Sequence, residues 1–593
     1  MKNISSVALA AGIGLLTASC AGHGGQAGLP PTSGMQSHTN GAHNSAVAVA
    51  APSGWATTAT QAVSVANASD LGALSASTPL TVRVALGVHN EDALAKAVAS
   101  GQQFSDAQLM ATYAPTSAEV QQVVSYLQAQ GFTNINASPN HLLVSADGTA
   151  AKAQSAFNTT LHSFSLSGAN VYANVSPAYV PTSLNGIAIA VLGLNNAAKV
   201  ASSPTDCFPT NPAPSGTPCV RDFDAHAVNT YYDTGNTPAA SNTTMAIMTE
   251  GNVSQTVSDL AYAEQVQGLP QVPVTVVQVG LSSPDTAGLD EWDLDSQSST
   301  GIAGGAKQLY LYDTTSLTDS DIANEYSHWE SDNLAQTGNS SFGECEFSPY
   351  LDGAMKADDN ILLFAAAHGQ TMFASSGDTG SSCAFVGTNG VPGSGPPFVS
   401  YPASSPWVVA VGGTTATSNN DETYDGEVAW NAGGGGLSQF ENATSWMQPV
   451  QLTTGTVAEA ELRGVPDIAM AADPNSGGYL LYTAVPLQTA SGPCGEPCGV
   501  GGTSEASPLS MGVWARMLTS HPGLGFAGPH LYANYVKYEG NEALVQGPPP
   551  YETYGGFHDI IAGANGAYTA APGYDYTTGL GTFDISALNA TIQ

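Results

Sequence analysis

The sequence predicts an α/β fold, with a large parallel sheet flanked by helices and preceded by a small α+β unit. Beyond residue 218, short apolar runs alternate with segments of helical periodicity, which is the pattern of parallel strands joined by right-handed crossovers. Between residues 79 and 200, strands and helices follow one another in a shorter, separate module. A Pro-rich connector at residues 203–218 divides the two stretches, so we expect two folded units.

The first twenty residues have the features of a secretory signal peptide. Lys2 precedes an apolar stretch at residues 7–16, and small residues lead up to Cys20. The stretch is too short to anchor the chain, and no later run approaches the roughly 18 apolar residues that a membrane helix needs. We therefore expect a secreted or periplasmic protein without a transmembrane segment. Lipidation of Cys20 is the alternative, although Thr17 stands where Leu is usual at such a site.

Residues 21–78 are mostly small or polar and read as a flexible linker. The next segment, residues 79–200, has the succession of strand and helix patterns expected of a compact, ferredoxin-like α+β domain. Its expected strands and helices lie at 80–88, 117–131, 141–148, 149–161 and 186–194.

The remaining segment, residues 201–593, is expected to form one large α/β domain without internal repeats. Its clearest strands lie at 245–251, 274–280, 308–313 and 371–378, and helical patterns lie at 259–268 and 321–332.

The charge balance excludes one class of partner. With 47 acidic and 11 basic side chains, the formal charge is −36, so the chain cannot build the cationic face that nucleic acid requires. Repulsion between carboxylates falls near pH 4, where model carboxyl groups are about half protonated. We therefore expect a protein that works in acid, with a halophilic or solubility-driven surface as the alternative.

The basic residues are unevenly placed. Arg83, Lys96, Lys152 and Lys199 all belong to the smaller domain. A relatively basic module ahead of a very acidic one predicts an electrostatically matched cover.

Seven cysteines support an oxidising compartment. Setting Cys20 aside leaves an even number, which permits 15 connectivities. The nearest-neighbour pairing joins Cys207 to Cys219, Cys345 to Cys383, and Cys494 to Cys498. Zinc is disfavoured because no histidine lies at zinc-finger spacing beside these pairs.

The segment GGTSEASPLSMGVWARM, residues 501–517, places Ser504 where a glycine turn opens a helix. Free backbone N–H groups at a helix start can stabilise an oxyanion beside such a hydroxyl. An ordinary N-cap is the alternative for an isolated serine.

A second segment, LDEWDLDSQSSTGIAGGA, carries Glu291 and Asp295 four residues apart, and therefore on one helix face. Two close carboxyl groups cannot both ionise freely, so the pair should titrate as a unit. A solvated acidic helix is the competing interpretation.

A third segment, MFASSGDTGSS, ends a strand with a Gly-rich loop that carries Asp378. Its simpler interpretation is a turn residue or a helix cap.

Together these motifs resemble the sedolisin family of serine-carboxyl peptidases, which have a subtilisin-like fold. PASSPWVVAVGGT at 402–414, AWNAGGGG, RGVPDIAM and the serine motif follow the family's order. Residues 79–200 resemble the activation propeptide of this family, of the pro-kumamolisin type, and residues 201–593 its catalytic domain.

The resemblance implies roles for four side chains. Ser504 would be the nucleophile, Glu291 the general base, Asp295 its carboxyl partner, and Asp378 the oxyanion carboxyl. It also implies a monomeric, self-inhibited zymogen that acts on protein or peptide substrates. Glu505 departs from the pattern, because a small residue commonly follows the serine.

A carboxylate base suits acid. At pH 4 an imidazole is neutral only about 0.3% of the time, whereas an ordinary Glu is ionised about a third of the time. A carboxylate therefore supplies about a hundredfold more available base.

The C-terminal segment at 558–581 resembles the family's calcium site. Carboxylates of Asp559 and Asp575 and carbonyls of Ile560, Ala571 and Gly573 would bind one structural Ca²⁺, an ion that prefers hard oxygen ligands. Ala571 stands where the family often has Gly.

Three rival functions remain. An ordinary subtilisin needs a catalytic histidine, and His368, which ends an apolar helix, is better explained as structural. A pepsin-like enzyme needs two Asp-Thr-Gly loops, and only Asp378 begins one. A secreted binding protein with a decayed peptidase fold is the non-enzymatic alternative.

Overall fold

The computed structural model describes residues 51–65, 68–166, 168–197, 205–206, 222–383, 392–452, 459–485, 487–489, 492–493, 497–538 and 553–593. The predicted signal peptide lies outside these residues, as do Lys199, Cys207, Cys219 and Cys494. Within the described ranges, no helix combines the length and the apolar character needed to cross a bilayer.

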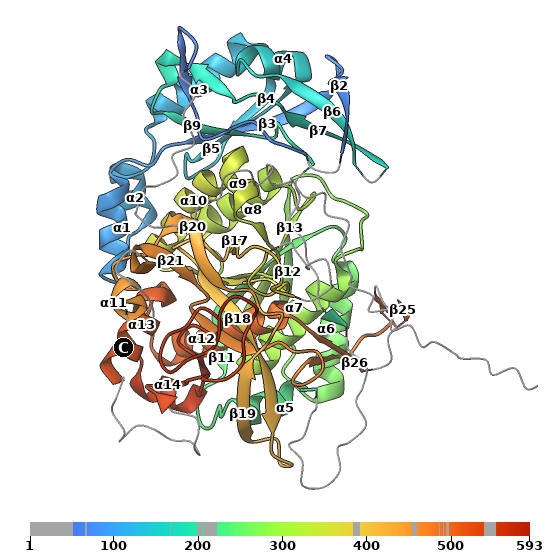
Figure 1. The fold of residues 1–593 in the computed structure, drawn as a ribbon, viewed down its shortest axis with the longest axis vertical. Helices are drawn as coiled ribbons and strands as arrows, with labels where there is room; N and C mark the ends of the chain where they lie inside the picture. The colour runs from blue at the N-terminus through green and yellow to red at the C-terminus, as the bar shows by residue number, and fades with distance from the viewer. Residues whose placement is uncertain are drawn as a thin grey trace, which may run out of the picture.

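The N-terminal unit is built on a four-stranded antiparallel sheet in the order β4-β5-β3-β9 (Figure 1). The helices α3 and α4 pack against this sheet and close a separate apolar core. Alternate residues of β3, such as Val82 and Val84, are buried in that core, as its period-two pattern predicts. The bounds are β3 Pro79–Leu86, α3 Ser117–Ala129, β4 Thr133–Ala137, β5 Leu143–Thr149, α4 Ala150–Ala156 and β9 Ala188–Leu192.

Smaller elements complete this unit. A second sheet has the order β2-β6-β7, and β1 pairs with β8. The bounds are β1 Trp55–Thr57, β2 Ser69–Ala73, α1 Glu91–Ala99, α2 Asp106–Thr112, β6 Leu161–Leu166, β7 Ala169–Asn174 and β8 Tyr179–Pro181.

The linker predicted for residues 21–78 is wrong over part of its length. Besides β1 and β2, the chain at Thr60 is 1% exposed, and its hydroxyl donates to the Val191 carbonyl at 3.0 Å. The Ala59 amide donates to the Ile189 carbonyl at 2.7 Å. The segment is ordered by backbone pairing and small buried side chains, which leave no hydrophobic periodicity in the sequence.

The large unit contains an eight-stranded sheet in the order β12-β13-β11-β14-β16-β18-β19, with β22 also paired to β18. All pairs are parallel except β18 with β19, in agreement with the predicted crossovers. The bounds are β11 Ala240–Glu250, β12 Val274–Val279, β13 Ala306–Thr314, β14 Thr337–Ser340, β16 Thr371–Ser375, β18 Val409–Ser418, β19 Tyr424–Ala429 and β22 Ile468–Ala471.

Helices of this unit form two groups. The helices α7 and α12 pack against each other and against β11, whereas α8 and α10 pack together and lie between the sheet and the N-terminal unit (Figure 1). The closest approach of α7 and α12 is at Gly512, where a Cβ atom would lie 2.4 Å from the Ser299 carbonyl oxygen. The helix bounds are α5 Ala225–Tyr231, α6 Ser254–Gln267, α7 Leu289–Ala303, α8 Asp319–Asp332, α9 Phe347–Asp352, α10 Ala354–His368, α11 Gln448–Gln451, α12 Thr503–Ser520, α13 Ala527–Tyr538 and α14 Ile585–Thr591.

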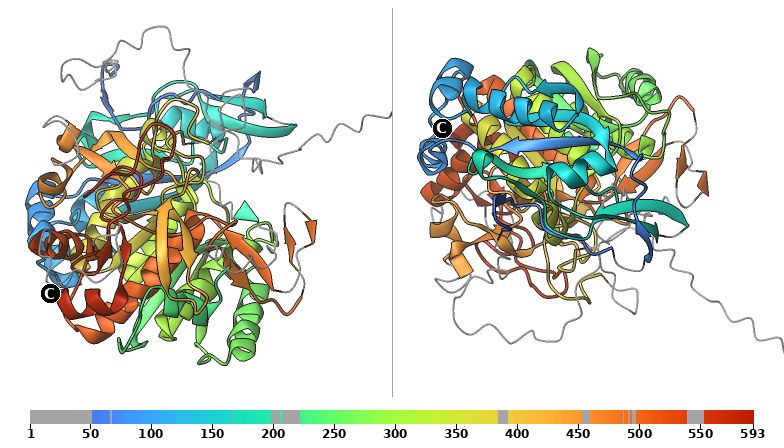
Figure 2. Two further views of the ribbon diagram at one scale, coloured as in Figure 1. Left: turned by 60° about the horizontal axis from the view of Figure 1, so that its bottom comes forward. Right: turned by 90° about the horizontal axis from the view of Figure 1, so that it is seen from above.

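The N-terminal unit covers one end of the large unit, as Figure 2 shows from above. Arg83 of β3 pairs with Asp321 of α8 at 3.0 Å, and Lys356 of α10 pairs with Glu91 of α1 at 2.7 Å. Each unit thus contributes the basic residue to one of these ion pairs and the acidic residue to the other. Of the basic residues expected to make the match, Lys152 instead donates to the Gly131 carbonyl within its own unit.

Further polar contacts cross the same interface. His368, at the end of α10, contacts Asp106 of α2 and Glu330 of α8, each at 2.9 Å. The Asn140 amide donates to Glu330 at 2.7 Å. His368 thus has a structural place between the two units, as the sequence predicted.

One predicted disulfide is confirmed. Cys345 and Cys383 are joined, and they link β15 (Glu344–Cys345) to the loop that follows Asp378. Cys498 is buried and also forms a disulfide, but the remaining predicted partners lie outside the described residues.

Candidate active site

Ser504 stands at the beginning of α12, immediately after the strand β26 (Cys498–Gly501). Gly502 makes the connection with φ +113°, a conformation that other residues rarely adopt, and a Cβ atom there would lie 2.5 Å from Asp378 Oδ2. The turn places Ser504, which is 4% exposed, in the first turn of the helix. Ser504 therefore lies where a glycine turn opens a helix, as the sequence predicted, and its role as the nucleophile stays a prediction.

Glu291 lies in the first turn of α7 and is fully buried. Within the described residues neither of its carboxyl oxygens has a hydrogen-bond partner of regular geometry, although the Ser504 hydroxyl is close enough to favour the ionised form. Burial raises the pKa of Glu291 well above that of an ordinary Glu. The charges of Asp295, Asp290 and Asp378 raise it further, so Glu291 holds its proton tightly when the neighbours are ionised.

Asp295 follows one helical turn later and is also fully buried. Its Oδ1 accepts a hydrogen bond from the Ser341 hydroxyl at 2.6 Å. Burial raises the pKa of Asp295 well above the usual value, and the hydrogen bonds from Ser341 and Asn339 partly oppose this rise. Because the charge of Asp295 raises the pKa of Glu291, the two carboxyls titrate as a coupled pair and resist being ionised together.

A chain of polar side chains supports Asp295. The Ser507 hydroxyl donates to Asn339 Oδ1 at 2.6 Å, and Asn339 Nδ2 donates to the Ser341 hydroxyl at 2.9 Å. The Ser341 hydroxyl lies 3.2 Å from the Ser504 carbonyl as well, while the Ser504 hydroxyl is 3.5 Å from the Ser341 carbonyl. These residues fix the carboxyl pair relative to the start of α12.

Sequence reasoning did not single out Asn339, Ser341 or Ser507. The available signal was position, because Asn339 belongs to β14 and Ser341 follows its last residue. Ligand and catalytic groups in parallel sheets gather at the carboxyl ends of the strands.

Asp378 follows β16 and reaches the start of α12. Its Oδ1 accepts two hydrogen bonds from Thr503, from the amide and from the hydroxyl, each at 2.8 Å. The Thr503 hydroxyl in turn accepts a hydrogen bond from the Gly377 amide at 3.0 Å. The loop and the helix are thereby held together next to Ser504.

Glu505, the departure from the expected motif, is fully buried and points away from water. Burial raises its pKa well above that of an ordinary Glu, and the nearby charges of Asp222 and Asp473 add to the rise. A neutral carboxyl here leaves the Ser504 turn intact.

The predicted calcium loop brings its five residues close together. Asp575 Oδ2 accepts from the Ala571 amide and Asp559 Oδ2 from the Gly573 amide, both at 2.9 Å. The carbonyls of Ile560, Ala571 and Gly573 accept no hydrogen bond from the described residues. Ala571 has no positive φ, so its side chain is tolerated.

This donor set fits a hard cation, with two carboxylates and three uncommitted carbonyl oxygens. Among the described residues, no group of three or more His, Cys, Asp or Glu side chains is arranged to hold a metal. Any ion here would therefore depend on backbone oxygens.

In the part of the chain that the structure describes, no imidazole contacts Ser504. The Ser504 hydroxyl instead lies near the Ser341 carbonyl oxygen and the Glu291 carboxyl group. The site accordingly lacks the histidine of an ordinary subtilisin. It combines a hydroxyl at a helix start with a buried carboxyl pair and a third carboxyl.

The comparisons with known proteins cover both units. The family model of the pro-kumamolisin activation domain matches residues 66–197, and that of the subtilase family matches residues 283–535. Sedolisin of Pseudomonas sp. (strain 101) is 37% identical over 511 residues, which cover 82% of this chain and 81% of the relative. Xanthomonalisin of Xanthomonas sp. (strain T-22) is 36% identical over 586 residues, 88% of this chain and 66% of the relative.

A solved structure gives the same result. Pseudomonas sedolisin, a serine-carboxyl proteinase complexed with two molecules of pseudo-iodotyrostatin, superposes with a TM-score of 0.54 at 35% identity. The match covers 63% of this chain and 98% of that one. The predicted subtilisin-like fold, with an N-terminal activation domain of mixed strands and helices, is confirmed.

Proposed function

This chain belongs to the sedolisin family of serine-carboxyl peptidases, and from that premise we propose that it is a secreted, acid-active endopeptidase made as a self-inhibited zymogen. The observation that carries the proposal is the pair of buried carboxyls, Glu291 and Asp295, one helical turn apart beside the Ser504 hydroxyl. No observation favours the alternative of a decayed binding protein.

In the proposed reaction, ionised Glu291 accepts the Ser504 proton as the hydroxyl oxygen attacks the peptide carbonyl. Glu291 then gives that proton to the leaving amine, and an acyl-enzyme remains. Water attacks the acyl carbon, Glu291 accepts the water proton, and the Ser504 oxygen leaves with a proton returned from Glu291. Asp295 keeps the second proton of the pair, so that only one negative charge is buried at a time.

The raised pKa of Glu291 has two opposing effects on this step. A smaller fraction of the base is ionised at pH 4 than for an ordinary Glu, but each ionised carboxylate is a stronger proton acceptor. Sharing a proton with Asp295 moderates the first effect, because the pair needs to lose only one proton to become active.

Asp378 is proposed to stabilise the oxyanion together with the Ser504 amide. Both hydrogen bonds from Thr503 arrive at Oδ1 and hold the carboxyl beside the start of α12, next to Ser504. This role needs a neutral carboxyl, so activity should fade as pH rises toward neutrality.

Secretion and inhibition extend the proposal. The signal-like N-terminus and the disulfide of Cys345 support an oxidising compartment outside the cytosol. The pairing of Arg83 with Asp321 supports an inhibitory cover held in part by charge, and the proposed trigger for its release is acid.

Ca²⁺ is proposed as a structural ion held by Asp559, Asp575 and the carbonyls of Ile560, Ala571 and Gly573. When bound, it would cross-link the C-terminal loop without taking part in the reaction. Chelation should therefore lower the melting temperature, and Ca²⁺ should restore it better than Mg²⁺ does.

The decisive experiment is a pH profile of peptide release from a denatured protein, with Ser504→Ala as the inactive control. We expect activity at pH 3 to 4 that Ser504→Ala abolishes, and N-terminal sequencing of the accumulating product should identify the activation cleavage. Equal peptide release by both proteins would refute the serine mechanism.

A further inference from the structure

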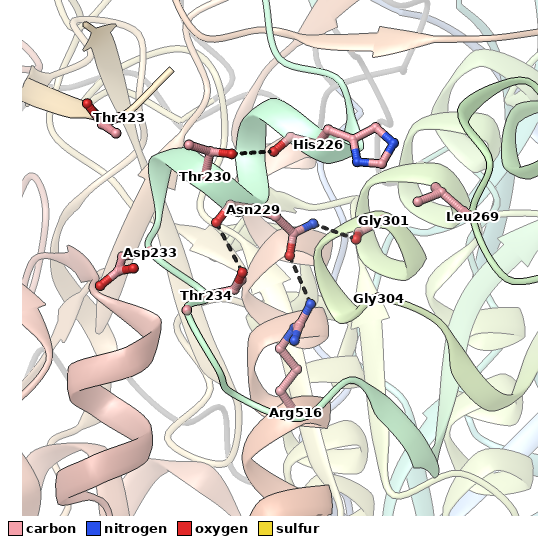
Figure 3. A pocket seen from close by; sticks show the side chains of 11 residues that line it. His226, Asn229, Thr230, Asp233, Thr234, Leu269, Gly301, Gly304, Thr423 and Arg516 are labelled. Carbon is pink, nitrogen blue, oxygen red and sulfur yellow. Dashed lines mark hydrogen bonds between the residues drawn. The ribbon is translucent and has the colours of Figure 1, made fainter. Parts of the chain in front are cut away.

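A cavity of about 500 Å³ opens on the large unit at the junction of α5, the end of α7 and the C-terminal part of α12 (Figure 3). Its wall includes His226 and Asn229 of α5, Leu269, Thr423 and Arg516. Arg516 and Ser504 are twelve residues apart on α12, a separation of about 18 Å along the helix axis. The cavity is therefore distinct from the catalytic centre.

The guanidinium of Arg516 forms part of this wall and is 6% exposed. Its Nε donates to the Ile302 carbonyl at 2.6 Å, one Nη to the Thr237 carbonyl at 2.8 Å, and the other Nη to Asn229 Oδ1 at 2.8 Å. A guanidinium has five N–H donors, so these three bonds leave two N–H groups without a partner among the described residues.

All three acceptors are neutral. No carboxylate lies within 4.0 Å of Arg516 among the described residues, although the chain has 47 acidic side chains. Burial alone lowers the pKa of Arg516 to about 10, which leaves it a cation under any condition in which the protein works. Buried cations are ordinarily compensated by an anion.

A second buried arginine of the same unit illustrates the usual solution. Arg463 is fully buried and lies 2.6 Å from the carboxylate of Asp467, whose charge raises the arginine pKa against the effect of burial. In the ranges that the structure describes, Arg516 has no such neighbour.

A structural role explains only part of the arrangement. Arg516 caps the carboxyl end of α7, where the helix dipole offers roughly half a negative charge. That role accounts for the bond to Ile302, but it does not require an adjoining cavity or two uncommitted donors. Asp233 also borders the cavity. Its carboxylate accepts the Ser586 hydroxyl at 2.7 Å and keeps its negative charge, so an anion would bind on the Arg516 side of the cavity.

We propose that this cavity is a binding site for a small oxyanion, a carboxylate or a sulfate-sized ion, with Arg516 as the principal ligand. Two parallel N–H groups of a guanidinium match the two oxygens of such an ion, and Asn229 holds the planar fork in place. Because α5, α7 and α12 meet here, the bound ion stabilises the contact between the two helices that carry Glu291 and Ser504.

The first test is a thermal melt of the full-length Ser504→Ala chain at pH 5 with increasing sulfate or acetate, against sodium chloride at equal ionic strength. A saturable rise in melting temperature of about 2–4 °C is expected, and Arg516→Met should abolish it. Lys537→Met is the matched control, since it removes one exposed cation away from the cavity and should keep the response. The anion that acts at the lower concentration identifies the natural class of ligand.

A rise of equal size in the Arg516→Met chain, or no rise in any chain, would overturn the proposal. If Arg516→Met does not fold, crystals of the Ser504→Ala chain soaked in selenate decide the question. An anomalous selenium peak beside the Arg516 guanidinium is expected, and peaks confined to other sites would rule the cavity out.

Discussion

The two folded units treat their carboxyl groups in opposite ways. Among the described residues of the N-terminal unit, the buried polar side chains are only Thr and Asn, and every Asp and Glu keeps contact with solvent. The large unit instead encloses many carboxyls, among them Asp259, Glu264, Glu291, Asp293, Asp295, Asp313, Asp319, Glu325, Glu346, Asp352, Asp358, Asp359, Glu427 and Glu505.

The pKa values diverge accordingly. In the N-terminal unit, a hydrogen bond from the Gly72 amide lowers the pKa of Asp70; burial tends to raise that of Glu119, but hydrogen bonds from Thr116 outweigh it. In the large unit, burial raises the pKa of Glu264 and Glu346 to about 7.

The sign of the pH dependence therefore differs between the units. A carboxyl with a lowered pKa stabilises its fold above the unfolded pKa, and that contribution is lost as pH falls. A carboxyl with a raised pKa stabilises the fold while protonated, and that contribution is lost as pH rises from about 4 to about 7. Acid thus favours the catalytic unit and weakens its cover.

The largest effect that would sharpen this comparison is expected from Glu291→Gln, because a buried carboxyl that we propose as the catalytic base should differ from one used in packing. We expect the catalytic rate to fall by about a thousandfold or more, since the amide cannot accept the Ser504 proton. Steady-state turnover of a peptide substrate at pH 4 is the measurement.

Glu325→Gln is the matched control for that variant. Glu325 is equally buried, and its Oε1 accepts a hydrogen bond from the Thr249 amide at 3.0 Å. Among the described residues, no contact joins Glu325 to Ser504. Its turnover should change by less than about threefold. If Glu291→Gln kept similar turnover, the base would have to be another residue.

The next effect concerns the opposite pH responses themselves. Hydrogen exchange of the full-length Ser504→Ala chain, corrected for intrinsic rates, should show the N-terminal unit losing protection from pH 5 to 3.5. The large unit should lose protection from pH 5 to 7, where Glu264, Glu344 and Glu346 begin to ionise.

One substitution isolates a single carboxyl from that response. Glu264→Gln mimics the protonated state and should raise the melting temperature at pH 7 by about 2 °C, with no gain at pH 4. Glu461→Gln, at an exposed position, should leave the melting temperature unchanged at both pH values.

In the hydrogen-exchange experiment, a parallel loss of protection in both units at both extremes of pH would contradict the opposite pH responses.

A smaller effect is expected at the interface between the units. Arg83→Met removes the ion pair with Asp321 and a hydrogen bond to the Ser320 hydroxyl, so the cover should be released several-fold faster at pH 5. Gel analysis of conversion to the mature form measures this rate. Lys152→Met is the control, because it removes the same charge at a contact within the N-terminal unit, and it should convert at the normal rate. Equal acceleration in both variants would assign the effect to net charge instead of to the ion pair of Arg83 with Asp321.

The sequence could predict those features of the fold and the site that depend on residues close together in the chain. The expected helix at 117–131 is α3 (Ser117–Ala129), because its apolar spacing and capping box are local features. The positions of Glu291, Asp295 and Ser504 were also legible, since each lies in the first two turns of a helix. Their side-by-side arrangement came from the family resemblance and not from periodicity.

The rest depends on contacts between distant segments. Ser341 reaches Asp295 only because β14 ends beside α12, and no local pattern records that neighbourhood. The ordered chain around Thr60 was missed for a similar reason, because its partners, Val191 and Ile189, lie about 130 residues later. Arg516 belongs to the same class, because its partners Ile302, Thr237 and Asn229 all precede it by 214 residues or more.

The smallest predicted effect tests the electrostatics of the catalytic pair directly. Asp290 is partly exposed, and its negative charge is one of those that raise the pKa of Glu291. Removing that charge in Asp290→Asn should lower the pKa of Glu291, so the base is ionised at lower pH and the acid limb of activity moves down. Solvent screening at this half-exposed position limits the shift to about 0.2–0.5 pH units. The measurement is the pH dependence of kcat/KM, with Asp421→Asn on an exposed turn as the control for net charge. A shift of the acid limb toward higher pH would contradict the assignment of Glu291 as the base, because losing a neighbouring negative charge makes its ionisation easier.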